Sequence, residues 1–136
     1  MGERFFKKIK VRVELMVTER MANDNFAVVL KRYMKEEHVK VTEFAQYVGI
    51  NKSTLTRYRN GNVIPTKKVL MRICIALHLY RERSDYLFEL CGYVLGNTNL
   101  HYLYKAILAD VFLNRRTIND YNEFLKENGV DENDLL

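Results

Sequence analysis

The sequence predicts an all-α fold, and three observations carry this prediction. The 136 residues include a single proline, Pro65, and six glycines, so few residues interrupt long helices. Apolar residues recur with a helical period over most of the chain. Residues that cap helix starts and glycines that end helices alternate along the sequence. Several short helices with brief turns are therefore the expected architecture.

The first 22 residues form a predicted N-terminal arm that leaves two interpretations open. Ile9, Val11 and Val13 alternate with polar residues, as in a β-strand. Phe6, Ile9, Val13 and Met16 also fall on one face of a helix. We retain both, with a slight preference for the helix because the neighbouring segments are helical.

The first two helices after the arm are each defined by an apolar face and a turn. From Asn25, apolar side chains recur along a helix that should end near Glu37 or His38. Thr42 is expected to cap the second helix, because its hydroxyl can accept a hydrogen bond from a free backbone N–H. Gly49 then supplies a turn that glycine adopts without strain.

The same signals predict five more helices. Asn51 is placed to cap the third helix, which runs through Arg59 and ends at the Asn60-Gly61 pair. The others are a fourth helix capped by Thr66, a fifth from Glu82 to Leu90 before Gly92, a sixth from Asn97 or Thr98 to about Leu113, and a seventh between Thr117 and Gly129.

Charge is distributed unevenly along the chain, whose net charge is +5. Residues 41–83 contain eight Lys and Arg against two Asp and Glu, whereas residues 84–136 contain four against nine. A basic middle beside an acidic end is expected if the middle faces a polyanion such as nucleic acid. A basic face that serves solubility alone is the other interpretation.

The stretch from Val41 to Asn60 has the pattern of a helix-turn-helix, in which two short helices cross at a tight turn. Ala45 is small where the second helix crosses it, and Gly49 relieves the turn. The pattern directs Phe44, Val48, Ile50, Leu55 and Tyr58 inward. It leaves Asn51, Lys52, Ser53, Thr56, Arg57 and Asn60 on the outer face.

These residues resemble the XRE family, the Cro and phage-repressor type of helix-turn-helix proteins, over about residues 26–92. The resemblance implies a five-helix DNA-binding domain at 23–92 and a C-terminal helical extension at 93–136. Gly92-Tyr93 and Asn128-Gly129 are similar to positions in a group of small bacterial members. The family's usual capping residue and following Gln are replaced by Lys40 and Val41. Either Thr42 starts the helix two residues later, or Lys40 makes that phosphate contact.

The resemblance implies a transcriptional regulator that reads duplex DNA through helix 52–59 in the major groove. Expected base contacts are Asn51, Lys52, Ser53 and Arg57. Expected phosphate contacts are Lys40, Thr42, Thr56, Arg59, Asn60, Asn62, Lys67 and Lys68. Outside a helix-turn-helix, Lys52 and Arg57 would be interpreted as ordinary solvated charges. For Lys67 and Lys68, a phosphate contact and an ordinary solvated charge are equally favoured.

A homodimer on half-sites roughly 34 Å apart is expected, because one monomer reads too few base pairs for selective binding. The dimer would form through the arm from Phe5 to Met21 or through the C-terminal helices, around Tyr102, Leu103, Leu108, Phe112, Tyr121 and Phe124. The alternative function is a protein-interaction module, either an adaptor or an antitoxin-like partner, that does not bind DNA.

Enzymatic, metal and membrane functions find little support in the sequence. Cys74 and His78 lie one helical turn apart, but zinc needs three or four ligands, so we expect no metal and no cofactor. Cys74 and Cys91 are expected to be reduced core thiols. Because no catalytic motif, signal peptide or membrane-length apolar run is present, we expect a cytoplasmic protein that is not an enzyme.

Overall fold

The computed structural model describes residues 20–136, which contain seven α-helices, one short 3₁₀ turn and no strand. The all-α prediction is therefore confirmed. The arm lies almost wholly outside the described residues, so its two interpretations stay open. The helices are α2 (Phe26–Glu36), α3 (Val41–Val48), α4 (Lys52–Arg59), α5 (Lys67–Ala76), α6 (Arg81–Cys91), α7 (Asn99–Asn114) and α8 (Ile118–Glu127), and the 3₁₀ turn is η1 (Glu132–Asp134).

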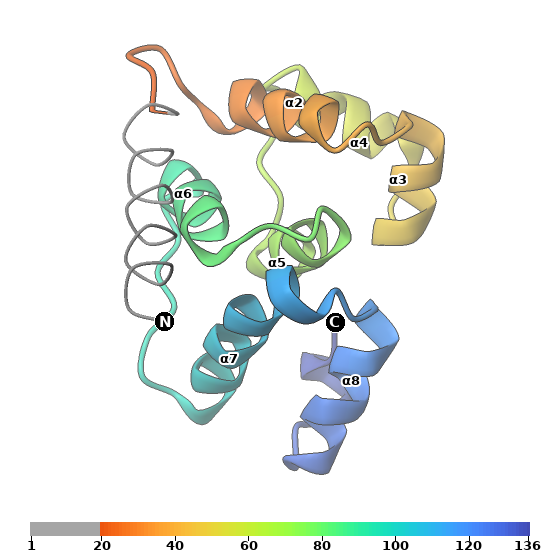
Figure 1. Ribbon diagram of the computed structural model, residues 1–136, viewed down its shortest axis with the longest axis vertical. Helices are drawn as coiled ribbons and strands as arrows, with labels where there is room; N and C mark the ends of the chain where they lie inside the picture. Colours follow the sequence, from red (N-terminus) through yellow and green to blue (C-terminus); the bar gives the residue numbers. More distant parts are fainter. Residues whose placement is uncertain (1–19) are drawn as a thin grey trace, which may run out of the picture.

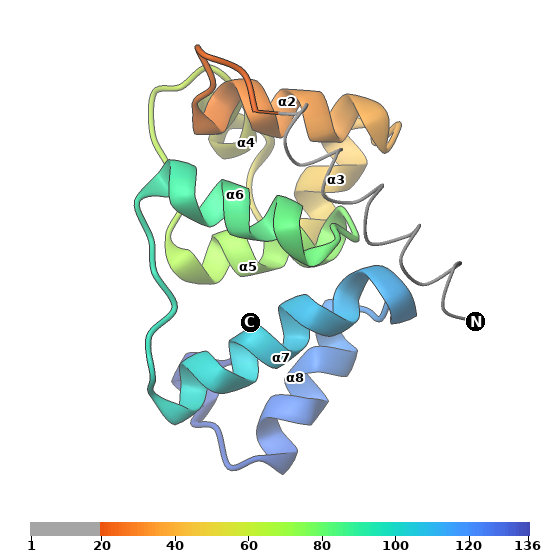
Figure 2. The ribbon, with the colours of Figure 1, turned by 60° about the vertical axis from the view of Figure 1, so that its left-hand side comes forward.

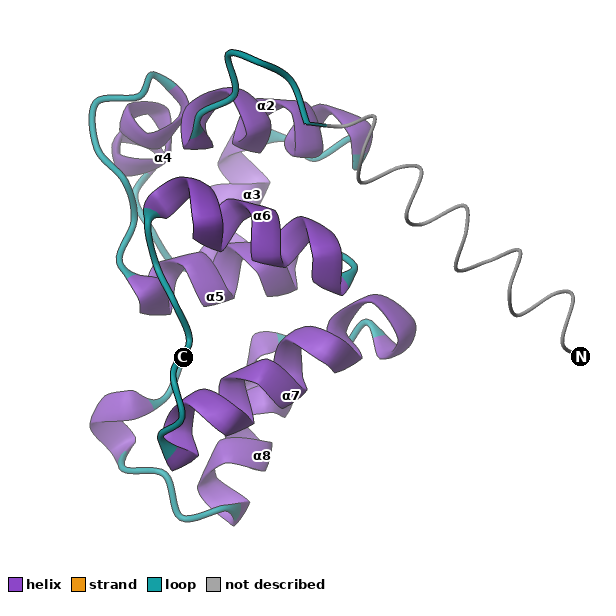
Figure 3. Ribbon diagram, turned by 90° about the vertical axis from the view of Figure 1, so that its left-hand side faces the viewer, coloured by secondary structure: helices purple, strands orange, loops and turns teal. Residues whose placement is uncertain are grey.

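The helices are stacked in three layers (Figures 1 and 2). Helices α2, α3 and α4 form the first layer, in which α4 contacts both α2 and α3. The second layer is α5 and α6, which support α3 and α2 respectively. Helices α7 and α8 form the third layer against α5 and α6, and loops join all the layers (Figure 3). Helix α5 is therefore the central element, with the first layer on one side and the third on the other.

Four of the helix starts are fixed by side chains that accept a hydrogen bond from a backbone N–H. Asn25 caps α2, and Thr66, Thr98 and Thr117 cap α5, α7 and α8. Each oxygen satisfies an N–H that has no partner inside its helix. The predicted caps at Thr66 and Thr117 are confirmed, and of the two starts left open for α7 the structure has Thr98. The predicted stop at Gly92 is also confirmed, with φ 74°.

The prediction that Thr42 caps the second helix is wrong. Helix α3 begins at Val41, and Lys40 occupies the capping position without a side-chain hydrogen bond to the helix. The first helical hydrogen bond runs from the N–H of Phe44 to the carbonyl of Lys40, over 2.8 Å. A cap is worth only about 1 kcal/mol. Packing of Phe44 and Ala45, which are both buried, sets the helix start instead.

The core runs continuously through the three layers. Leu30 of α2, Leu55 of α4 and Ile73 of α5 are completely buried, as is Val111 of α7. Cys74 also lies in this core, and burial raises the pKa of its thiol to about 12. The prediction of buried, unpaired thiols is confirmed for Cys74 and Cys91.

A part-buried ion pair fixes the start of α2 against α6. The carboxylate of Asp24 is 3% exposed, and it accepts hydrogen bonds from Arg32 Nη2 at 2.6 Å and from the Tyr86 hydroxyl at 2.6 Å. Burial alone would raise the pKa of Asp24, but the hydrogen bonds from Arg32 and Tyr86 outweigh it and lower the pKa to about 2. This carboxylate therefore helps to join the first and second layers, as does the ion pair between Glu36 of α2 and Arg83 of α6 at 2.6 Å.

We expect Asp24→Asn to destabilise the fold at pH 7 by about 2 kcal/mol, because the charged form is stabilised in the native state. This contribution is present above the unfolded pKa of 3.8 and is lost as the pH falls towards 2. Urea unfolding at pH 7 and near pH 2 measures it. Glu89→Gln is the control, because its ion pair with Arg20 is exposed and should contribute under about 0.5 kcal/mol. Equal losses for both variants, or a loss that does not depend on pH, would contradict this role.

Candidate functional site

The helix-turn-helix predicted at residues 41–60 is present as α3, a three-residue turn and α4. Gly49 ends α3 with φ 80°, and its N–H and that of Ile50 both bond to the carbonyl of Ala45, at 2.9 and 3.0 Å. Ala45 is 2% exposed, and Leu55 of α4 is fully buried. The turn is therefore closed by backbone hydrogen bonds over a small side chain, as the sequence predicts.

A guanidinium from α5 occupies the space beside this turn. A methyl group added at Gly49 would overlap the Arg72 guanidinium. The Nε of Arg72 is buried and has no hydrogen-bond partner. Gly49 is therefore constrained twice, by its left-handed backbone and by a side chain 23 residues away. Arg72 could not be predicted from the sequence, because no local pattern links α5 to this turn.

The outer face of α4 is exposed and carries the predicted base-contact residues. Asn51, Lys52, Ser53 and Arg57 are all exposed, and all four lie on the first two turns of the helix or just before it. Thr56 is also exposed, but its hydroxyl donates to the carbonyl of Lys52 within the helix at 3.0 Å. The face therefore offers amide, hydroxyl and cationic groups to a partner.

The predicted phosphate-contact residues differ in exposure and in the contacts that they already make. Lys40, Thr42, Asn60 and Asn62 are exposed, and Arg59 is partly buried. Lys67 is half-buried, with its ammonium 5.9 Å from the centre of the Tyr93 ring. Lys68 is turned to another partner, because its Nζ donates to the carbonyl of Asn133 at 2.6 Å.

The N-termini of α3, α4 and α6 lack the side-chain caps that are present at α2, α5, α7 and α8. Neither Lys40 nor Asn51 makes a side-chain capping hydrogen bond, although both occupy the capping position. Backbone N–H groups in the first turn of each helix are thus not satisfied by a cap. Together with the helix dipole, such groups favour a negative charge. The predicted cap at Asn51 is correct in position, but the hydrogen bond is absent.

Comparison with known families identifies the region that contains this site. Residues 29–79 match the model of the Cro/C1-type HTH DNA-binding domain. These residues form a Cro/C1-type helix-turn-helix domain. The predicted XRE relationship is confirmed for this region, which falls inside the expected domain 23–92.

One relative supports the same assignment. The ImmF control region 10 kDa protein of Bacillus phage phi105 is 37% identical to this chain over 51 residues. That alignment covers 38% of this chain and 57% of the phage protein, so the chain spans little more than half of its relative. No solved structure matches the chain significantly.

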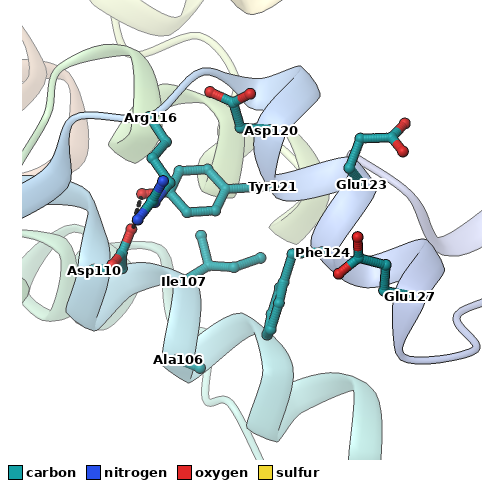
Figure 4. Close-up of a pocket in the computed structure, with 9 residues that line it drawn as sticks. All are labelled: Ala106, Ile107, Asp110, Arg116, Asp120, Tyr121, Glu123, Phe124 and Glu127. Carbon is teal, nitrogen blue, oxygen red and sulfur yellow. Dashed lines mark hydrogen bonds and ion pairs between the residues drawn. The ribbon is translucent and has the colours of Figure 1, made fainter.

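A groove lies between α7 and α8, outside the region that matches the Cro/C1-type domain. It encloses about 560 Å³. Arg116 bonds to Asp110 at 3.2 Å, and the Tyr121 hydroxyl donates to the same carboxylate at 2.7 Å (Figure 4). The remaining lining residues are Ala106, Ile107, Asp120, Glu123, Phe124 and Glu127. The only cationic side chain in this lining is therefore already paired, and the groove is acidic.

The residues expected to form a C-terminal dimer interface divide between core and surface. Leu108 and Tyr121 are buried in the core of the monomer. Tyr102 and Phe112 are exposed by 56% and 44%. Only part of the predicted set is thus accessible to a second copy.

Within residues 20–136, no three His, Cys, Asp or Glu side chains are arranged to hold a metal ion. None of the helices in this range has the length and apolar character needed to cross a membrane.

We expect Gly49→Ala to destabilise the domain by about 1–2 kcal/mol from the left-handed backbone, plus the cost of displacing Arg72. Gly129→Ala is a matched control, because Gly129 has φ 76° and nothing within 4 Å of its added methyl group. Chemical denaturation measures both variants. Adding Arg72→Ala should cancel the extra loss in Gly49→Ala. If the two glycine variants lose equal stability, Arg72 does not constrain the turn.

Proposed function

We propose that this protein is a cytoplasmic, sequence-specific transcriptional regulator that binds duplex DNA through α4 in the major groove. The single observation that carries the proposal is the exposed polar and cationic face of α4 within a Cro/C1-type domain. An α-helix fits the major groove, where each base pair presents a distinct pattern of donors and acceptors. The control-region name of the phage relative supports a regulatory role.

The exposed residues divide into base-reading and positioning groups in this proposal. Arg57 can donate two hydrogen bonds to a guanine, and such a pair contributes roughly 1–3 kcal/mol of discrimination. Asn51, Lys52 and Ser53 lie at the start of α4, where they reach neighbouring base edges. The positioning group contacts phosphates and sets the register without reading sequence, and it comprises Lys40, Thr42, Thr56, Arg59, Asn60, Asn62, Lys67 and Lys68.

The uncapped starts of α3 and α4 add support to the phosphate contacts. The backbone N–H groups of the first turn of α3 follow Lys40, so an ammonium and a helix dipole act at the same place. This supports Lys40 as the replacement for the family's usual phosphate-binding residue. The later start at Thr42 is excluded by the observed helix boundary.

A homodimer completes the proposal. Two copies related by a two-fold axis would read half-sites roughly 34 Å apart, which doubles the number of specified base pairs. The exposed Tyr102 and Phe112 of α7 are available for self-association. The N-terminal arm, as the other candidate, lies almost wholly outside the described residues.

The second candidate function is a protein-interaction module. The acidic groove between α7 and α8 favours it, because such a surface would repel DNA and attract a basic partner. Retention on heparin and an affinity for DNA that falls steeply with salt would support the regulator over this alternative.

We expect Arg57→Ala and Lys67→Ala to weaken DNA binding in different ways. The first removes a base contact and should flatten sequence preference by roughly 1–3 kcal/mol at one base pair. The second removes a phosphate contact and should weaken all sequences alike, lowering the salt slope by about one unit. Titration of a selected duplex, its point variants and a random duplex measures both effects. Equal effects of both variants on every duplex would reject this division of roles.

We expect Asn51→Asp to separate stability from DNA binding. An aspartate at the start of α4 interacts favourably with the helix dipole, so the free energy of unfolding should stay the same or rise by about 0.5 kcal/mol. The same charge would face a phosphate or a base edge, and DNA affinity should fall by about tenfold. Asn25→Asp, at the start of α2, makes the same charge change outside the predicted contacts. If both variants bind DNA equally well, α4 does not face the duplex.

A further inference from the structure

The segment after α8 returns across the protein and is fixed at three places. Lys68 Nζ donates to the Asn133 carbonyl at 2.6 Å, and the Tyr104 hydroxyl donates to the Asp134 carbonyl at 2.9 Å. The side chain of Asn122 exchanges two hydrogen bonds with the backbone of Leu136, at 2.6 and 2.7 Å. We call residues 131–136 the C-terminal clasp.

The clasp combines an apolar attachment with an acidic outer surface. Leu135 and Leu136 are partly buried against the core. Asp131, Glu132 and Asp134 are exposed, and the clasp contains no Lys or Arg to balance them. Its polar contacts with α5 and α7 are made through the backbone carbonyls of Asn133 and Asp134. Within residues 20–136, the Asp131 carboxylate accepts a hydrogen bond from the N–H of Asn133, whereas the structure records no hydrogen bond or ion pair for the carboxylates of Glu132 and Asp134. Within its own six residues the clasp therefore carries three carboxylates and no cation, and the positive side chain bonded to it is Lys68 of α5.

The position of Lys68 places this charge at the edge of the proposed DNA site. Lys68 is the second residue of α5, directly after the loop that follows α4. The first turn of α5, with Lys67 and Lys68, is one of the proposed phosphate-contact segments. Because Lys68 bonds to Asn133, between Glu132 and Asp134, a phosphate near Lys68 would also lie near these carboxylates. Charges within about 8–10 Å interact at physiological salt.

We propose that the clasp is an autoinhibitory element, which occupies Lys68 and sets acidic groups against the DNA backbone at the start of α5. This inference rests on the proposed DNA binding. In the closed state, Lys68 donates to a protein carbonyl, and a phosphate must compete for the same ammonium. In the open state, the hydrogen bonds of Tyr104 and Asn122 to the clasp break, and Lys68 becomes available to a phosphate.

The proposal separates two contributions that different variants can test. Neutralising Glu132 and Asp134 removes the repulsion while the backbone contacts of the clasp remain. Removing the hydrogen-bonding groups of Tyr104 and Asn122 releases the clasp while its charge remains. The first change acts through electrostatics, and the second acts through the population of the open state.

The first experiment compares DNA affinity for the native chain, Glu132→Gln/Asp134→Asn and a control. The control, Glu123→Gln/Glu127→Gln, makes the same net charge change in the acidic groove between α7 and α8. We expect the clasp variant to bind about three- to tenfold more tightly in 50 mM salt, with the difference declining as salt rises. The control should gain much less. Equal gains in both, or no gain in the clasp variant, would overturn the proposal.

The second experiment measures the salt dependence of Tyr104→Phe/Asn122→Ala, after thermal unfolding has shown that the variant is folded. A released Lys68 adds one phosphate contact, so the slope of log affinity against log salt should steepen by about 0.9. A slope equal to the native one in a folded variant would overturn the proposal. If no folded variant binds any duplex, the proposed DNA binding fails, and the inference fails with it. If the variants of both experiments bind DNA with the affinity and salt slope of the native chain, only the clasp proposal fails.

Discussion

The close crossing of α3 and α4 is the constraint on which the rest of the site depends. Two helices can approach this closely only where one presents a small side chain, and Ala45 supplies it at 2% exposure. The chain must also reverse within three residues, and Gly49 does so with a positive φ. With these two residues in place, Leu55 turns inward and the opposite side of α4 must turn outward. The exposure of Lys52, Ser53 and Arg57 is thus a geometric result of burying Leu55.

Helix α5 transmits this arrangement to the rest of the protein. One of its faces packs on α3, and Arg72 fills the space beside the turn. Other faces pack on α7 and α8, and its first turn carries Lys67 and Lys68. Five of its ten residues are buried, from Leu70 to Ile75. A change that shifts α5 would therefore move the helix-turn-helix, the edge of the proposed DNA site and the C-terminal layer together.

Local sequence signals predicted most of the fold but not its long-range contacts. The caps at Thr66 and Thr117 and the turn at Gly49 depend on neighbouring residues, so pattern alone located them. The start of α3 was misplaced because the preference for a threonine cap is weaker than the packing of Phe44. Contacts such as Asp24 with Tyr86 and Lys68 with Asn133 join residues more than 60 positions apart. No periodicity encodes such pairs, so the engagement of Lys68 was not foreseen.

The attachment of the third layer has an evolutionary consequence. Helices α7 and α8 pack mainly on α5 and α6, whereas α4 packs on α2 and α3. The region that matches the Cro/C1-type domain also stops at residue 79, before α6 begins. Descendants of such a protein could exchange or lose the distal helices while keeping the residues around α4, provided that a new segment covered the exposed side of α5. Divergence in this layer could then change assembly or control without altering the outer face of α4.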